Sequence, residues 1–135
     1  MQNLPSPASP FRIGTRGSPL ALAQAHETRD RLGAAFGLPQ EAFEIVVIKV
    51  TGDAVQDRPL KEIGGKGLFT REIEDALLGG RADVAVHSAK DLPAKLEPGL
   101  VLTAFPERVD ARDALVAHDK SMTIESLPQK ARVGT

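Results

Sequence analysis

The sequence contains no cysteine, and this absence excludes several kinds of chemistry at once. Without a thiol, the 135 residues can form no disulfide, supply no thiolate metal ligand and offer no cysteine nucleophile. The three histidines at positions 26, 87 and 118 lack the short spacings typical of metal sites. The sequence therefore predicts neither a zinc site nor a thiol enzyme within this chain.

An excess of charge of one sign is also missing, as is any long apolar run. Seventeen Lys and Arg residues balance eighteen Asp and Glu residues, so no overall field attracts nucleic acid or an anionic membrane. No apolar run approaches the roughly 20 residues that span a bilayer. Residues 1–10 are rich in proline and lack the apolar segment of a secretory signal. We expect a disordered tail at 1–10 and a cytoplasmic protein.

The residues that are present predict a soluble α/β domain. Hydrophobic residues make up 41% of the chain and charged residues 26%, which is typical of globular proteins. Apolar, β-prone runs at 11–15, 42–50, 82–87 and 100–106 predict strands. Helical patterns occur within 16–37 and 68–81, with Ser18 and Pro19 as a start signal for the first and Gly33 or Gly37 as its stop. The long segment 51–67, dense in glycine, proline and charge, is expected to be a functional loop.

The alternation of strands and helices predicts βαβ units and a mixed, largely parallel sheet. In such sheets ligands bind just beyond the carboxyl ends of the strands. The segments to inspect are therefore those that follow the predicted strands, "TRGS" at 15–18, "TGD" at 51–53 and "HSAKD" at 87–91.

The common phosphate and hydrolase motifs do not occur in this chain. "GGKG" at 64–67 lacks the serine or threonine of a P-loop, and Thr70 stands where a dinucleotide fingerprint needs its third glycine. "RGSPL" at 16–20 lacks the Gly-x-Ser-x-Gly elbow of serine hydrolases. Nucleotide binding and serine hydrolysis are both disfavoured.

Several residues instead have the chemistry of a site for a small anion. Arg16 and Ser18 stand before a predicted helix, whose free N–H groups favour negative charge, and Lys66 lies in the glycine-rich loop. Each also has an ordinary structural explanation, because Ser18 can simply cap the helix and the two cations can be solvated. These residues alone do not decide between the two interpretations.

The cluster "VHSAKD" at 86–91 also has both a structural interpretation and an interpretation as a binding site. His87 can be a core histidine, Ser88 a turn residue, Lys90 a surface charge and Asp91 a helix cap. Alternatively, a carboxylate beside a lysine at the end of a buried strand can bind N–H donors, neutralise anionic substrate groups and handle protons. The residues predict a site for a small polyanion with one acid–base carboxylate.

Four motifs together resemble hydroxymethylbilane synthase, also called porphobilinogen deaminase. They are "RIGTRGSPLALAQA" at 12–25, "GGKGLFTREIEDALL" at 64–78, "ADVAVHSAKDLP" at 82–93 and the closing "VGT". The resemblance implies an enzyme of haem and tetrapyrrole biosynthesis that joins four porphobilinogens, releasing ammonia at each step, on a covalently held dipyrromethane cofactor. It also implies a monomer with domains like those of periplasmic binding proteins.

The resemblance also implies roles for individual residues. Asp91 would be the catalytic carboxylate, which contacts pyrrole nitrogens and stabilises the cation formed as ammonia leaves. The positions that would bind the carboxylate arms of cofactor or substrate are Arg16, Ser18, Ser88 and Lys90. Lys66 matches a loop lysine over the cleft and Phe69 a neighbouring aromatic position, and both would contact cofactor or substrate. Asp53 and His87 would support the site.

The resemblance also bears on domain organisation. We expect residues 11–105 to be an incomplete first domain, and 106–135 to contain a hinge and the start of a second domain with short strands at 113–118 and 132–135. The paired arginines and the cofactor cysteine of the family do not occur in these 135 residues, so we expect an N-terminal portion that is inactive alone. The alternative is a cytosolic anion-binding or effector-sensing module of the periplasmic-binding-protein type.

Overall fold

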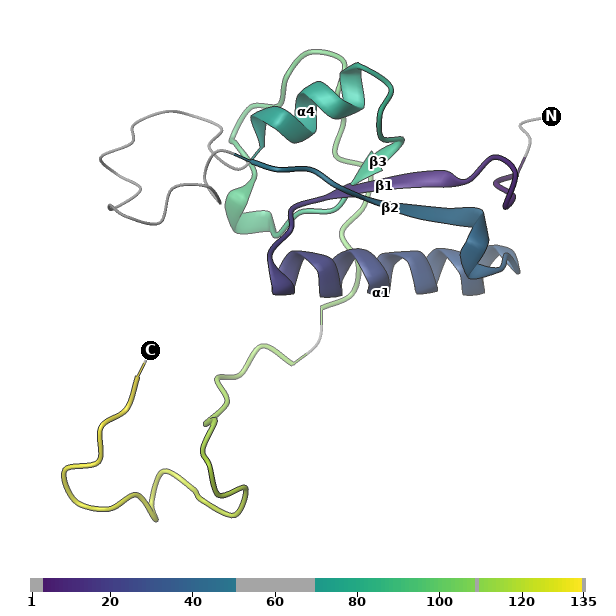
Figure 1. Cartoon of the computed structure of the whole chain (residues 1–135). Helices are drawn as coiled ribbons and strands as arrows, with labels where there is room; N and C mark the ends of the chain where they lie inside the picture. Colours follow the sequence, from purple (N-terminus) through teal and green to yellow (C-terminus); the bar gives the residue numbers. More distant parts are fainter. Residues whose placement is uncertain (1–3, 51–69, 109, 135) are drawn as a thin grey trace. The chain divides into compact units, whose positions relative to one another are not determined.

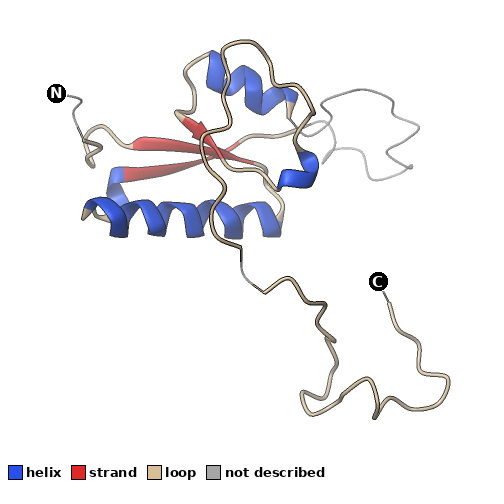
Figure 2. Cartoon of the chain, turned by 180° about the vertical axis from the view of Figure 1, so that it is seen from behind, coloured by secondary structure: helices blue, strands red, loops and turns tan. Residues whose placement is uncertain are grey.

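A computed structural model describes residues 4–50, 70–108 and 110–134 (Figure 1). The chain divides into two units, residues 1–102 and 103–135, and each is considered by itself. The first unit contains a three-stranded parallel sheet with the strand order β2-β1-β3. Helix α1 covers one face of this sheet and helix α4 the other (Figures 1 and 2). The predicted α/β class and the parallel pairing are confirmed.

The first βα unit follows the local signals of its sequence. Strand β1 spans Phe11–Thr15, and helix α1 spans Pro19–Phe36. The Ser18 side chain accepts a hydrogen bond from the backbone N–H of Ala21, which satisfies one of the free donors at the helix start. Gly37 ends the helix with φ of 65°, a left-handed conformation that favours glycine, and its N–H donates to the Gly33 carbonyl.

The remaining elements of the first unit are shorter. A 3-10 turn at Gln40–Ala42 leads into β2, Phe43–Val47, which pairs with β1 along its whole length. Helix α4 spans Arg71–Leu78, ends at Gly79 and is followed by Gly80 with φ of 67°. Strand β3 is only Val84–Ala85, and a 3-10 turn at Ala89–Asp91 follows it.

Each face of the sheet has its own small core. Beneath α1, the side chains of Ile13, Ala25 and Phe43 form one buried cluster. Beneath α4, the second cluster contains Ile48, Val50, Ile73 and Ala76. Successive strand residues point to opposite faces, so the apolar run of β2 serves both clusters, as its composition predicts.

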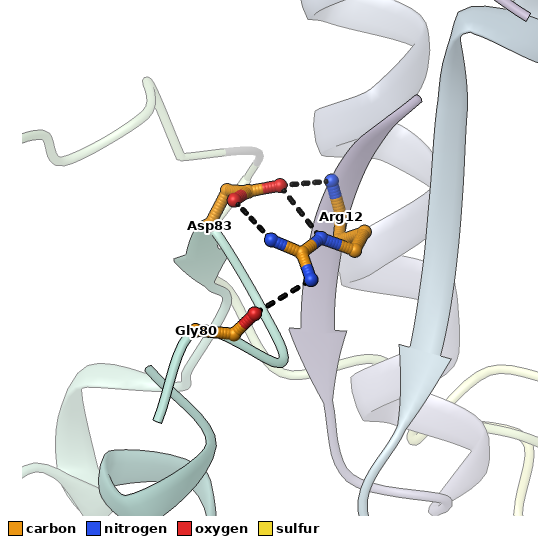
Figure 3. Close-up of polar contacts among 3 residues, drawn as sticks. All are labelled: Arg12, Gly80 and Asp83. Atoms are coloured by element: carbon orange, nitrogen blue, oxygen red, sulfur yellow. Dashed lines mark hydrogen bonds and ion pairs between the residues drawn. The ribbon is translucent and has the colours of Figure 1, made fainter. Parts of the chain in front are cut away.

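One polar contact ties the start of β3 to β1 (Figure 3). The Arg12 side chain donates to both carboxylate oxygens of Asp83, at 3.1 Å from Nε and 2.7 Å from Nη2. Its Nη1 donates to the Gly80 carbonyl at 2.6 Å, and its backbone N–H donates to Asp83 at 2.8 Å. The backbone N–H of Asp83 returns a bond to the Arg12 carbonyl at 2.9 Å. We call this set of contacts between Arg12, Gly80 and Asp83 the Arg12–Asp83 clamp.

Some predicted strands are wrong or shorter than expected. Residues 100–106 form no strand, although the turn before them is present, with the Leu100 N–H donating to the Glu97 carbonyl. Their apolar side chains are exposed, with Val101 at 78% and Phe105 at 74%. Apolar, β-prone composition makes a strand only where a neighbouring strand accepts its hydrogen bonds, and none does so here among the described residues. Strand β3 covers only Val84–Ala85 of the predicted 82–87.

The second unit lacks the predicted strands at 113–118 and 132–135 within its described residues, 103–108 and 110–134. Local turns organise it instead. Arg112 pairs with Asp110 two residues earlier. The Ser126 N–H donates to the Thr123 carbonyl at 3.1 Å and closes a second turn. The predicted loop at 51–67 lies outside the described residues. No helix in the described part of the chain is long and apolar enough to cross a membrane.

The core beneath α4 yields a stability prediction. Ile73→Ala should lower the free energy of unfolding by about 2–5 kcal/mol, because Ile73 is fully buried and its removal leaves a cavity. Leu78→Ala on the same helix is the matched control, since Leu78 is 54% exposed, and it should cost much less. Urea denaturation of both variants measures the difference. Equal losses would contradict the core assignment.

The clamp yields a pH prediction. The hydrogen bonds from Arg12 hold the pKa of the Asp83 carboxyl below its usual value. A carboxyl with a lower pKa in the folded state contributes stability above about pH 4, and the contribution is lost as pH falls through the folded pKa. Asp83→Asn should therefore make stability less dependent on pH in this acid range. Urea unfolding between pH 2 and 6 measures this, and identical pH slopes for variant and wild type would refute it.

Candidate functional site

The strand order places a ligand-binding crevice at the carboxyl end of β1. The chain leaves β1 to form β2 on one side and later returns to form β3 on the other. Loops that leave the strands on the two sides of such a switch point diverge, and open α/β sheets bind their ligands in the space between them. Here the loop after β1 and the loop after β3 flank that space.

A pocket lies at this point, and we call it the strand-end pocket. Its volume is about 130 Å³, below the roughly 300–1,000 Å³ typical of sites that enclose a whole drug-sized ligand. The space suits one ring or one carboxylate arm of a larger molecule. The pocket is lined by Arg16, Ser18, Leu20, Ala21, Val86, His87, Ser88, Lys90 and Asp91.

An ion pair joins the two loops within the pocket. Nη1 of Arg16 lies 3.1 Å from Oδ2 of Asp91, although the residues are 75 positions apart in the sequence. Both side chains are largely shielded, with 16% of Arg16 and 18% of Asp91 exposed. A carboxylate has about four acceptor positions, so Asp91 can accept a further N–H donor while it is paired with Arg16.

Two serines have different roles in this arrangement. Ser18 caps α1, which confirms the structural interpretation of that residue while leaving it on the pocket wall. Ser88 donates from Oγ to Oε1 of Gln24 at 3.1 Å, a contact between the loop after β3 and helix α1. The 3-10 turn then begins, with the Asp91 N–H donating to the Ser88 carbonyl at 3.0 Å. This turn directs the Asp91 carboxylate towards Arg16.

His87 lies beside the ion pair in a partly buried position. Burial lowers the pKa of its imidazole below the usual range, the Asp91 charge acts in the opposite direction, and the Arg16 charge lowers it further. The imidazole is therefore neutral at pH 7, with one nitrogen that donates and one that accepts. A neutral His87 adds no positive charge to a pocket that already contains Arg16 and Lys90.

The pocket also has an apolar side. Leu20 is 59% exposed at the start of α1, and Ala21 and Val86 complete this wall. A pocket with one apolar wall and several polar groups suits a flat ring with charged substituents. Among the described residues no group of three or more His, Asp or Glu side chains could hold a metal ion.

Six of the nine predicted site residues meet in this one pocket, namely Arg16, Ser18, His87, Ser88, Lys90 and Asp91. The other three, Asp53, Lys66 and Phe69, lie outside the described residues. Sequence reasoning missed Leu20 and Gln24. Helical spacing offered a signal, because residues three and four apart share a helix face and Gln24 follows Ala21 and Leu20 at those intervals.

Comparisons with known proteins show the family of the chain. The family model described as porphobilinogen deaminase, dipyromethane cofactor binding domain, matches residues 11–135. The chain belongs to the porphobilinogen deaminase family. A curated porphobilinogen deaminase from Paracoccus denitrificans (strain Pd 1222) is 63% identical over 135 residues. The match covers all of this chain and 43% of the relative, so the chain spans less than half of that porphobilinogen deaminase.

The strand-end pocket fits part of the cofactor that the family model names. Arg16 and Lys90 can bind carboxylate arms, Asp91 can accept a pyrrole N–H, and Leu20 offers an apolar surface to the ring. The volume of the pocket matches one ring or arm and not the whole group. The chain contains no cysteine, so none of these 135 residues can hold the cofactor by a thioether.

The surroundings of His87 predict that two substitutions shift its pKa in opposite directions. The pKa of His87 should lie below 6.5, should fall further in Asp91→Asn and should rise in Arg16→Gln, because the two charges act on it in opposite directions. Titration of the His87 ring protons by NMR measures all three values. A shift of the same sign in both variants would contradict the described geometry.

Proposed function

We propose that this chain provides the catalytic carboxylate and part of the substrate-binding surface of a hydroxymethylbilane synthase. Such an enzyme is a transferase that joins four porphobilinogens into linear hydroxymethylbilane and releases one ammonia at each step. The observation that carries the proposal is the ion pair between Arg16 and Asp91, because it brings a carboxylate and a cation from two different loops into one shielded pocket.

Asp91 is the residue proposed to act on the reacting groups. Loss of ammonia from porphobilinogen breaks a carbon–nitrogen bond and leaves a positive charge spread over the pyrrole ring. A fixed carboxylate that accepts the pyrrole N–H stabilises this charge as it develops, and a shielded site strengthens the effect. The pairing with Arg16 fixes the direction of the carboxylate before substrate arrives.

The cations around Asp91 are proposed to hold the substrate in place. Each porphobilinogen carries two carboxylate arms, which need cationic or N–H partners. Arg16 can bind a carboxylate with two parallel hydrogen bonds, and the exposed Lys90 can act as a point charge. Ser88 donates its one hydroxyl hydrogen to Gln24, so it would bind a carboxylate arm by exchanging that bond for one to the arm. Binding at these groups would set the distance between the ring and Asp91.

The same residues are proposed to hold the dipyrromethane. When bound, this group supplies the pyrrole carbon to which the first porphobilinogen is joined. Arg16, Ser88 and Lys90 would bind its carboxylate arms, and Asp91 would accept its pyrrole N–H groups. Ser18 and His87 on the pocket wall would support these contacts.

Further parts of the proposal rest on the sequence resemblance. Lys66 and Phe69 would contact carboxylate arms or rings, and Asp53 would support the site. Residues 11–105 would belong to a first domain of the periplasmic-binding-protein type, and 106–135 to a hinge and the start of a second such domain. The full-length enzyme would be a cytoplasmic monomer. The family match disfavours the alternative of an effector-sensing module.

The experiment that tests the proposed function is the replacement of Asp91 in the full-length, cofactor-loaded protein. Asp91→Asn keeps the shape of the side chain but removes its charge, so kcat should fall about 10²–10⁴-fold. Asp30→Asn is the matched control, because Asp30 lies on helix α1 outside the strand-end pocket with its side chain 52% exposed, where it pairs with Arg29 and accepts a 3.3 Å hydrogen bond from Gln40. Release of ammonia and formation of hydroxymethylbilane are the measurements.

Circular dichroism shows whether each variant is folded. An Asp91→Asn protein that is folded, loaded and as fast as the wild type would remove Asp91 from the catalytic role. A wild-type protein that consumes no porphobilinogen would refute the proposed function as a whole.

A further inference from the structure

Strand β3 has unusually little backbone pairing to hold it against β1. Only two residue pairs join β3 to β1, Ile13 with Val84 and Gly14 with Ala85, whereas β1 and β2 pair over five residues. Two backbone bonds frame the short ladder, from Asp83 N–H to the Arg12 carbonyl at 2.9 Å and from Val86 N–H to the Gly14 carbonyl at 3.0 Å. The position of β3 therefore depends on contacts outside the ladder.

Val84 packs against the cluster beneath α1 and Ala85 against the cluster beneath α4, and the Arg12–Asp83 clamp supplies the directional polar contacts. The guanidinium binds the carboxylate through two nitrogens, a rigid geometry that fixes direction as well as distance. Its third nitrogen binds the Gly80 carbonyl, so the connection from α4 into β3 is held at both of its ends (Figure 3). The clamp thus locates Asp83, the residue just before β3, against Arg12, the second residue of β1.

The strand-end pocket lies at the other end of the same two strands. Arg16 is four residues after Arg12, and Asp91 is eight residues after Asp83. A slip of one residue moves a strand by about 3.3 Å and turns every side chain to the opposite face. The Arg16–Asp91 contact is 3.1 Å long, so even part of such a movement would separate the two groups beyond hydrogen-bonding distance.

We propose that Arg12 and Asp83 are positioning residues for the reaction, which hold β3 in register so that Asp91 meets Arg16 in the strand-end pocket. This inference rests on the proposed function. Neither residue lines the pocket, so the pair acts through the strand and not by contact with substrate.

The clamp is suited to setting position more than to holding the fold together. About a third of each side chain is exposed, at 35% for Arg12 and 32% for Asp83, and ion pairs so open to water add little to stability. The two buried clusters on either face of the sheet hold the first unit together independently of the clamp. Loss of the clamp should therefore leave a folded protein whose β3 is misplaced.

The test uses the full-length protein loaded with dipyrromethane. Asp83→Asn keeps the shape of the side chain and removes its charge, while Arg12→Lys keeps the charge and loses the forked geometry. Each substitution should lower kcat per loaded cofactor about 10- to 100-fold and change KM much less. Misplacement of a catalytic group by about 1 Å lowers the reaction rate on the order of 100-fold. Glu27→Gln is the matched control, since it breaks the exposed Arg31–Glu27 pair on helix α1 and should leave kcat unchanged.

Hydrogen exchange gives a second measurement that does not depend on activity. The Val86 N–H bonds to Gly14 on the β3 side of β1, and the Ile48 N–H bonds to the Thr15 carbonyl at 2.8 Å on the β2 side. In Asp83→Asn and Arg12→Lys the Val86 amide should exchange faster, while the Ile48 amide should keep its wild-type rate. A general loss of stability would accelerate both amides.

The proposal is overturned if kcat per loaded site stays near the wild-type value in both clamp variants. It is also overturned if kcat falls while exchange at Val86 is unchanged, because the effect would then not pass through β3. Equal acceleration at Val86 and Ile48 would show a purely structural role. If one variant fails to fold, the other decides the question. If the wild type is inactive, the proposed function fails, and the exchange rates alone decide whether the clamp positions β3.

Discussion

Each edge of β1 is hydrogen-bonded to a parallel strand, β2 on one side and β3 on the other. Because β1 is the central strand, its carboxyl end lies between loops that leave the sheet in different directions. Arg16 and Ser18 follow β1 directly, and the turn that carries Asp91 follows β3. Without the pairing of β1 to β3, these residues would be unrelated surface side chains. The strand-end pocket is thus a consequence of strand order.

The electrostatics of the pocket follow from that arrangement. The ion pair between Arg16 and Asp91 is mostly shielded from solvent, so a charge that develops nearby is stabilised more than it would be in water. Burial keeps His87 neutral at pH 7, which leaves Arg16 and Lys90 as the cations that face anionic arms. A pocket of this kind fits a ring with carboxylate substituents, and the family match names a cofactor with that chemistry.

The features that were predicted correctly from the sequence are those determined by neighbouring residues. The cap at Ser18 and the bounds of β1 were correct, and of the two predicted stops, Gly33 and Gly37, the second ends the helix; each depends on neighbouring residues. The strand predicted at 100–106 was wrong, since strand formation there needs a partner that composition does not reveal. Six site residues were predicted from their place after the strands. The contacts of Gln24 with Ser88 and of Arg12 with Asp83 were not predicted, because they join segments that are distant in the sequence.

The most direct measurement of the central claim is a crystal structure of the full-length protein with its dipyrromethane bound. In that structure the Asp91 carboxylate should accept hydrogen bonds from pyrrole nitrogens at about 2.7–3.2 Å, and Arg16 should contact a carboxylate arm of the same group. Strand β3 should stay beside β1 in the register described above. A cofactor whose pyrrole nitrogens contact other residues, with Asp91 turned away from them, would contradict the account.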